Sequence, residues 1–178
     1  MDKEVLLKKL EEARIKYKPE KVKAIFIAEA PPDSLNRFFY YENVKEKDYL
    51  FLGIIDILYP GLKDIYIKKY KRHPEVKKSI LNQIKKNGYY LLDLFELPIS
   101  INSESKINSI KKLSGKLSKI CDKETPIILI KVNVYDTIYH ILKAKFNIIN
   151  KRIDFPSTGN QQKFKKSFAE AMNEITSK

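Results

Sequence analysis

The chain has 178 residues, of which 43% are apolar and 11% are aromatic, and its formal net charge at pH 7 is +13. This length and apolar content suit one domain with a substantial core, so we expect residues 1–178 to form a single domain. The longest uncharged apolar runs fall well short of the roughly 20 residues that span a bilayer, and residues 1–20 have the pattern of a charged amphipathic helix rather than of a signal peptide. We therefore expect a cytoplasmic, monomeric protein that does not associate with membranes.

The composition also limits the cofactors and partners. One cysteine, Cys121, and two histidines, His73 and His140, provide neither the four thiolates of an iron-sulfur cluster or structural zinc nor a histidine-rich metal site. We expect no cofactor and no metal cluster, although magnesium bound by carboxylates stays open. The positive charge favours DNA as a partner, while a lysine-rich composition can also reflect genome bias or a hot habitat.

The first half of the chain predicts two helices around one strand. Apolar residues recur at helical spacing between a possible cap at Asp2 and Pro19, which indicates an amphipathic helix. The apolar run at 22–28 predicts a strand that is covered on both faces. Residues 48–58 are apolar enough for a buried strand or a buried helix, and we favour the helix.

The second half predicts helices that alternate with strands. We expect helices at about 74–87, 107–120, 133–145 and 164–175, and strands at 89–97, 126–132 and 147–154. Asn133 is expected to cap the third of these helices. Such alternation produces right-handed crossovers and a parallel sheet with helices on both faces. We therefore predict a three-layer α/β/α sandwich with a central four-stranded parallel sheet.

Ligands of such open sheets bind at the carboxyl ends of the strands. There the first strand ends in Glu29, and Pro31 and Pro32 then force the chain into an extended or turning path. The segment FPSTGN, residues 155–160, leads from the last predicted strand into the last helix, where backbone amides at a helix N-terminus favour an anion. The same segment also fits a plain capping turn.

These two segments resemble motifs of the uracil-DNA glycosylase superfamily. IAEAPP at 27–32 resembles the first active-site motif, written G-E-A-P-G in one branch, and FPSTGN at 155–160 resembles the second, which begins H-P-S. They follow the first and the last strand, as they do in that family, and the resemblance extends over about residues 22–170. It implies a DNA-repair glycosylase that flips a deaminated or damaged base and hydrolyses its N-glycosidic bond, as a divergent member without a metal cluster.

The resemblance also implies a role for individual residues. Glu29 matches the catalytic acidic residue, whose carboxylate stabilises the cationic sugar or positions the attacking water, although Glu29 could instead cap a turn or pair with a lysine. Phe38 or Phe39 would stack on the flipped base. Asp93 falls near an asparagine that reads the base in relatives. Because an ionised Asp only accepts hydrogen bonds, either the base is not uracil or Asp93 is structural.

The second motif departs from the family at its first residue. By this resemblance Phe155 would lie in the base-binding site, where relatives usually have a histidine that stabilises the departing base. Losing one such contact typically costs about 100- to 1,000-fold in rate. The turn that follows is expected to bind DNA phosphates through Ser157, Thr158, Gly159, Asn160 and Lys163.

Whether the chain is an enzyme stays open at this point. The alternative is a catalytically inactive DNA- or nucleotide-binding protein of the same fold, which Phe155 and Asp93 favour. A third option is an enzyme that acts on a different, acidic small substrate.

Overall fold

A three-stranded parallel sheet forms the centre of the protein. The computed structural model describes residues 2–177, with strands β1 (Ala24–Ala28), β2 (Tyr89–Asp93) and β3 (Ile127–Leu129) in the order β2-β1-β3. Every residue of β1 and β3 is buried, as expected for strands covered on both faces. The α/β class predicted from the sequence is therefore confirmed.

The predicted fourth strand is wrong. Residues 147–154 run beside β3 but form only two isolated parallel bridges, Ile127 to Ile148 and Ile130 to Ile153. The amides of Ile148 and Lys151 donate to carbonyls only two residues back, at 3.0 and 2.9 Å. Such tight turns bend the backbone away from the regular pleat, so the ladder cannot continue between the two bridges.

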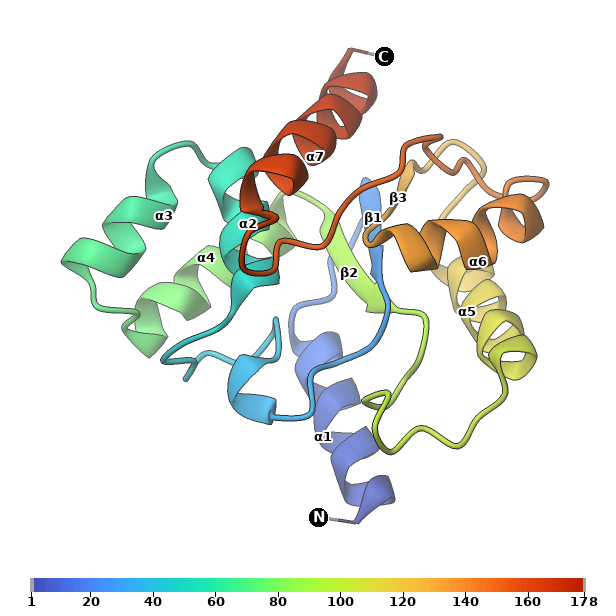
Figure 1. Ribbon diagram of the computed structural model, residues 1–178, viewed down its shortest axis with the longest axis horizontal. Helices are drawn as coiled ribbons and strands as arrows, with labels where there is room; N and C mark the ends of the chain where they lie inside the picture. The colour runs from blue at the N-terminus through green and yellow to red at the C-terminus, as the bar shows by residue number, and fades with distance from the viewer. Residues whose placement is uncertain (1, 178) are drawn as a thin grey trace.

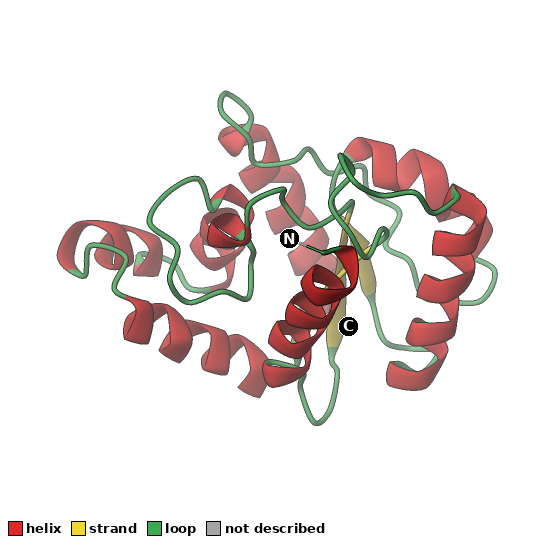
Figure 2. Cartoon of the chain, turned by 90° about the horizontal axis from the view of Figure 1, so that it is seen from below, coloured by secondary structure: helices red, strands yellow, loops and turns green. Residues whose placement is uncertain are grey.

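Helices cover both faces of the sheet. Their bounds are α1 Lys3–Lys16, α2 Tyr49–Leu58, α3 Leu62–Asp64, α4 Pro74–Lys86, α5 Lys106–Ile120, α6 Val132–Leu142 and α7 Gln161–Thr176, with a 3₁₀ turn at Leu35–Arg37 and a π-helical turn at Ile65–Lys69. Figure 1 shows α6 and α7 in front of the sheet and α1 and α5 behind it, and Figure 2 shows the strands surrounded by helices. On the α7 side, the ring of Phe168 meets that of Phe26 edge to face, with 5.2 Å between centroids.

Helix ends follow the predicted signals in most places. Asp2 caps α1 by accepting a hydrogen bond from the Glu4 amide at 3.0 Å, and α4 begins at Pro74. The prediction that Asn133 caps α6 is wrong, because the helix begins at Val132 and Lys131 holds the cap position. The backbone of Lys131 has φ 85°, which ends the extended chain two residues earlier than a cap at Asn133 would.

Candidate functional site

The carboxyl ends of the three strands bring Glu29 and Lys131 together. Glu29 follows β1 directly, and Lys131 follows Ile130, whose amide donates to the carbonyl of Ile27 at 2.8 Å. The ammonium of Lys131 donates to Oε2 of Glu29 in an ion pair, and both side chains are partly exposed. The pairing of Glu29 with a lysine, one of the roles open from the sequence, is therefore present, and it leaves a fixed carboxylate at this edge.

The backbone of Lys131 is strained. A positive φ in a non-glycine residue costs on the order of 1–3 kcal/mol and persists only where its surroundings hold it. Here the amide of Lys131 donates to the carbonyl of Ile153 at 3.0 Å, and the carbonyl of Lys131 accepts from the amide of Val134 at 3.0 Å. The sequence predicts Lys131 near the end of the strand at 126–132 but gives it no role. The available signal was a charge directly after a buried strand, the same signal that singled out Glu29.

A pocket of about 190 Å³ lies next to Glu29. It is lined by residues from five parts of the chain: the loop after β1 (Ala30, Pro31, Pro32), the aromatic loop (Arg37, Phe38, Phe39), the start of α2 and the residue before its cap (Lys47, Tyr49, Leu50, Phe51), β2 (Leu91, Asp93) and Phe155. Glu29 is not among the lining residues, but the three residues that follow it are. The backbone of Glu29 therefore adjoins the pocket, while its carboxylate is held by Lys131 and does not line the pocket.

All four residues that the sequence predicted for base binding line this pocket. Phe38 and Phe39 come from the loop after β1, Asp93 ends β2, and Phe155 lies far along the chain. Phe38 and Phe39 are only 1% and 4% exposed, whereas Phe155 is half-buried. Much of the surface of Phe38 and Phe39 is therefore used in packing, which leaves Phe155 as the most accessible of the three rings.

Asp93 forms a buried ion pair with Arg14 of α1. Nη2 of Arg14 donates to Oδ2 of Asp93 at 2.6 Å, and both side chains are 3% exposed. Burial raises the pKa of the Asp93 carboxyl, and the adjacent guanidinium opposes that rise. The guanidinium carbon of Arg14 also lies 5.2 Å from the centroid of the Phe38 ring. Asp93 thus has a structural partner, which is an arginine from α1.

Arg37 and Lys47 add two cationic side chains to the pocket wall. Arg37 is half-buried and forms no ion pair with any of residues 2–177. Lys47 is exposed and lies 4.0 Å from Glu46. An arginine without a carboxylate partner can stabilise negative charge that develops in the pocket. Sequence reasoning missed both residues, since neither belongs to a recognisable pattern.

The predicted phosphate-binding turn lies next to the pocket. The Asn160 amide donates to the Ser157 carbonyl at 2.9 Å, and Gly159 has φ 84°, which a glycine adopts without strain. The hydroxyl of Thr158 donates to that of Tyr49, a pocket residue, at 3.3 Å. Asn160 holds the cap position of α7, but its side chain accepts no hydrogen bond from the first amides of the helix. Thr158, Gly159 and Lys163 are exposed.

Comparisons of the chain with protein-family models, with curated proteins and with solved structures found no match. Within residues 2–177, no helix has the length and apolar character needed to cross a membrane. The same part of the chain contains no cluster of three or more His, Cys, Asp or Glu side chains arranged to hold a metal ion.

Proposed function

We propose that this protein is a DNA glycosylase-like enzyme, which takes one flipped base into the aromatic pocket and hydrolyses its N-glycosidic bond. The observation that carries the proposal is that Phe38, Phe39, Asp93 and Phe155 line one small pocket next to Glu29. The resemblance to the uracil-DNA glycosylase superfamily assigns these four residues to base binding from the sequence alone. Their meeting at one place supports the same assignment independently.

The size and walls of the pocket suit a single aromatic ring. An apolar cavity of about 150 Å³ holds one benzene molecule, and this pocket measures about 190 Å³. Stacking on an aromatic side chain contributes about 1–3 kcal/mol of binding free energy per base. A pyrimidine-sized base therefore fits better than the double ring of a purine.

Glu29 is in a suitable place for the reacting sugar, because it lies beside the base pocket and not within it. When the bond between C1′ and the base nitrogen breaks, the electron pair leaves with the base and the sugar becomes a cation. The carboxylate of Glu29 stabilises that cation and orients the water that adds to C1′. The added water loses a proton to bulk water, and the departed base takes up a proton from bulk water. Lys131 acts as a positioning residue, since its ion pair fixes the carboxylate.

The departing base also needs stabilisation, which relatives obtain from a histidine that is Phe155 here. In the proposed mechanism Arg37 supplies it. Its guanidinium is on the pocket wall without a carboxylate partner, so its charge is available to the anionic base.

The test is the formation of abasic sites. Duplex oligonucleotides that carry uracil, hypoxanthine, xanthine or a G-paired mismatch are incubated with the protein and then treated with alkali, which cuts the strand at abasic sites. We expect breaks at one lesion, and we expect Glu29→Gln to reduce their rate by about 100-fold or more. Glu20→Gln removes an exposed carboxylate elsewhere on the protein and should leave the rate unchanged.

A second candidate is a DNA-binding protein of the same fold without catalysis. Two observations favour it: Phe155 offers no hydrogen-bond donor, and Glu29 is already engaged by Lys131. Bound DNA with no breaks at any lesion would support this second candidate and contradict the first.

A further inference from the structure

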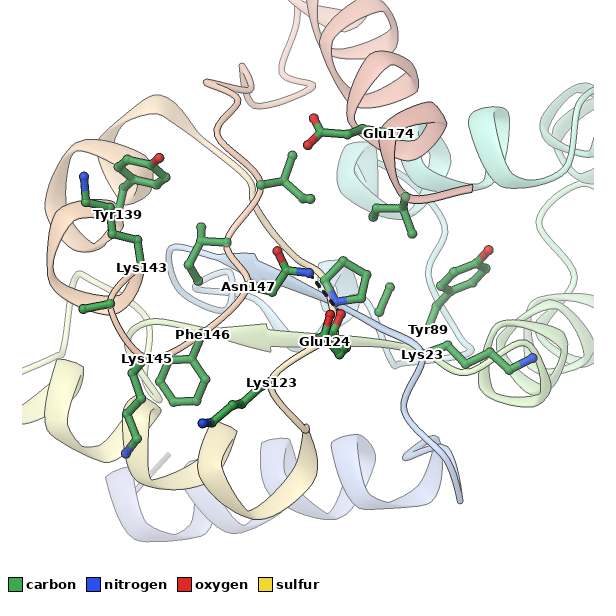
Figure 3. A pocket seen from close by; sticks show the side chains of 16 residues that line it. Lys23, Tyr89, Lys123, Glu124, Tyr139, Lys143, Lys145, Phe146, Asn147 and Glu174 are labelled. Carbon is green, nitrogen blue, oxygen red and sulfur yellow. Dashed lines mark hydrogen bonds between the residues drawn. The ribbon is translucent and has the colours of Figure 1, made fainter. Parts of the chain in front are cut away.

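A wide concavity lies at the opposite edge of the sheet from the proposed site. Ala24, Tyr89 and Pro126, at the amino ends of the three strands, form part of its lining, and its volume is about 1350 Å³. The end of α6, the loop after it and the last turns of α7 complete its walls (Figure 3). Because β1, β2 and β3 are parallel, their amino ends all lie at this edge and their carboxyl ends at the other. No residue that lines this concavity also lines the proposed base pocket.

Four lysines surround this concavity: Lys23, Lys123, Lys143 and Lys145. Figure 3 shows them around its outside, with Asn147 and Glu124 at its centre. All four are exposed, and none forms an ion pair with any residue of the described chain, 2–177. Lys112 of α5, by contrast, is paired with Glu104 at 2.7 Å.

Aromatic rings alternate with these cations. The half-buried ring of Tyr139 is stacked on Tyr135 at 4.5 Å between centroids, and the Lys143 ammonium lies 5.1 Å from the Tyr139 centroid. The Lys145 ammonium lies 5.4 Å from the centroid of the Phe146 ring, which is itself buried. Half-buried Tyr89 is also part of the lining. Cations beside partly exposed rings are the combination that binds unpaired bases together with their phosphates.

We propose that this concavity binds a segment of single-stranded nucleic acid. The lysines neutralise phosphates, and a base stacks on the face of Tyr139 that Tyr135 does not cover. Unpaired bases suit the surface better than a duplex, because the bases of a duplex are already stacked on one another. This binding requires neither the base pocket nor Glu29, so it goes beyond the proposed function.

The test measures the affinity of the full chain for a short fluorescent oligothymidylate by anisotropy, over a range of salt concentrations. Each lysine-phosphate contact contributes about 0.7 to the slope of log K against log salt. We therefore expect Lys143→Gln/Lys145→Gln to lower the slope by about 1.4 and to weaken binding about 25-fold near 0.1 M salt. The matched control is Lys3→Gln/Lys9→Gln on α1, which removes the same charge from exposed positions and should leave affinity nearly unchanged.

Three results would overturn the proposal. The first is equal weakening by the two lysine pairs, which would mean that only net charge matters. The second is unchanged affinity in Tyr139→Leu, for which we expect a loss of about tenfold from stacking. The third is a duplex that binds as tightly as the single strand and loses the same affinity in Lys143→Gln/Lys145→Gln. Glu29→Gln leaves this surface intact, so failure of the proposed glycosylase activity would be seen separately.

Discussion

A buried lysine lies beneath one wall of the base pocket. The side chains of Asp48 and Lys77 are 0% exposed, with 3.9 Å between Nζ and Oδ2, and Arg72 forms a closer ion pair with the same aspartate. The Lys77 ammonium lies 4.3 Å from the centroid of Phe51, a pocket residue, and Nζ has no hydrogen-bond partner among residues 2–177. Burial lowers the pKa of Lys77 to about 8, and the attraction of Asp48 only partly opposes this.

This depressed pKa predicts a pH-dependent stability. Between about pH 8 and about pH 10 the unfolded chain keeps the Lys77 proton while the folded chain loses it, so the free energy of unfolding rises with pH. At one pKa unit per about 1.4 kcal/mol, the rise is about 2 kcal/mol. Chemical denaturation of the wild type and of Lys77→Met measures it as the difference between the two proteins, which cancels the other titrating groups. A difference that stays constant over this range would contradict the prediction.

At the scale of residues, the sequence did not reveal which groups pair with the charged residues of the site. Glu29 was located from its place after a buried strand and Asp93 from the family resemblance, but their partners Lys131 and Arg14 lie 102 and 79 residues away along the chain. Arg14 had one signal, because it continues the helical spacing of Leu6 and Leu10 on the buried face of α1. A charge within an apolar stripe needs a buried partner, yet periodicity alone cannot tell which residue that is.

At the scale of elements, the junction between β3 and α6 controls the proposed site. Helix α6 begins one residue after Lys131, whose φ of 85° turns the chain and aims the side chain so that it reaches Glu29. The sequence predicted both elements but placed the cap at Asn133, because asparagine is a common cap and a lysine with positive φ is rare. The fourth strand failed for a related reason: its apolar residues are correct for a strand, but local turns at Ile148 and Lys151 interrupt it.

The strain at Lys131 can be measured with two substitutions. Lys131→Ala and Lys131→Gly both remove the ion pair with Glu29, but only glycine relieves the positive φ. We expect Lys131→Gly to be more stable than Lys131→Ala by about 1 kcal/mol, in contrast to the usual preference for alanine. Thermal or urea denaturation gives the comparison. An alanine variant as stable as the glycine variant would show that the backbone is not strained there.

At the scale of the whole molecule, the two edges of the sheet have different surfaces. The carboxyl edge has a small aromatic pocket with a fixed carboxylate beside it, and the amino edge has a wide concavity surrounded by lysines. The alternation of helices and strands in the sequence was enough to predict the parallel sheet and which edge would hold Glu29 and Asp93. It could not predict the pocket volume or the roles of Arg37 and Lys47, since these depend on how loops distant in sequence pack.

The most direct test of the central claim compares the release of free base from DNA by the wild type with that by a variant whose pocket has been filled. Ala30 lines the pocket, so Ala30→Leu reduces its volume while Glu29 and the phosphate-binding turn stay in place. A pool of lesion-bearing oligonucleotides is incubated with each protein, and free bases are identified by mass spectrometry. We predict that the wild type releases one base, and that Ala30→Leu binds the same DNA but releases none. No released base from the wild type, or equal release by both proteins, would contradict the account.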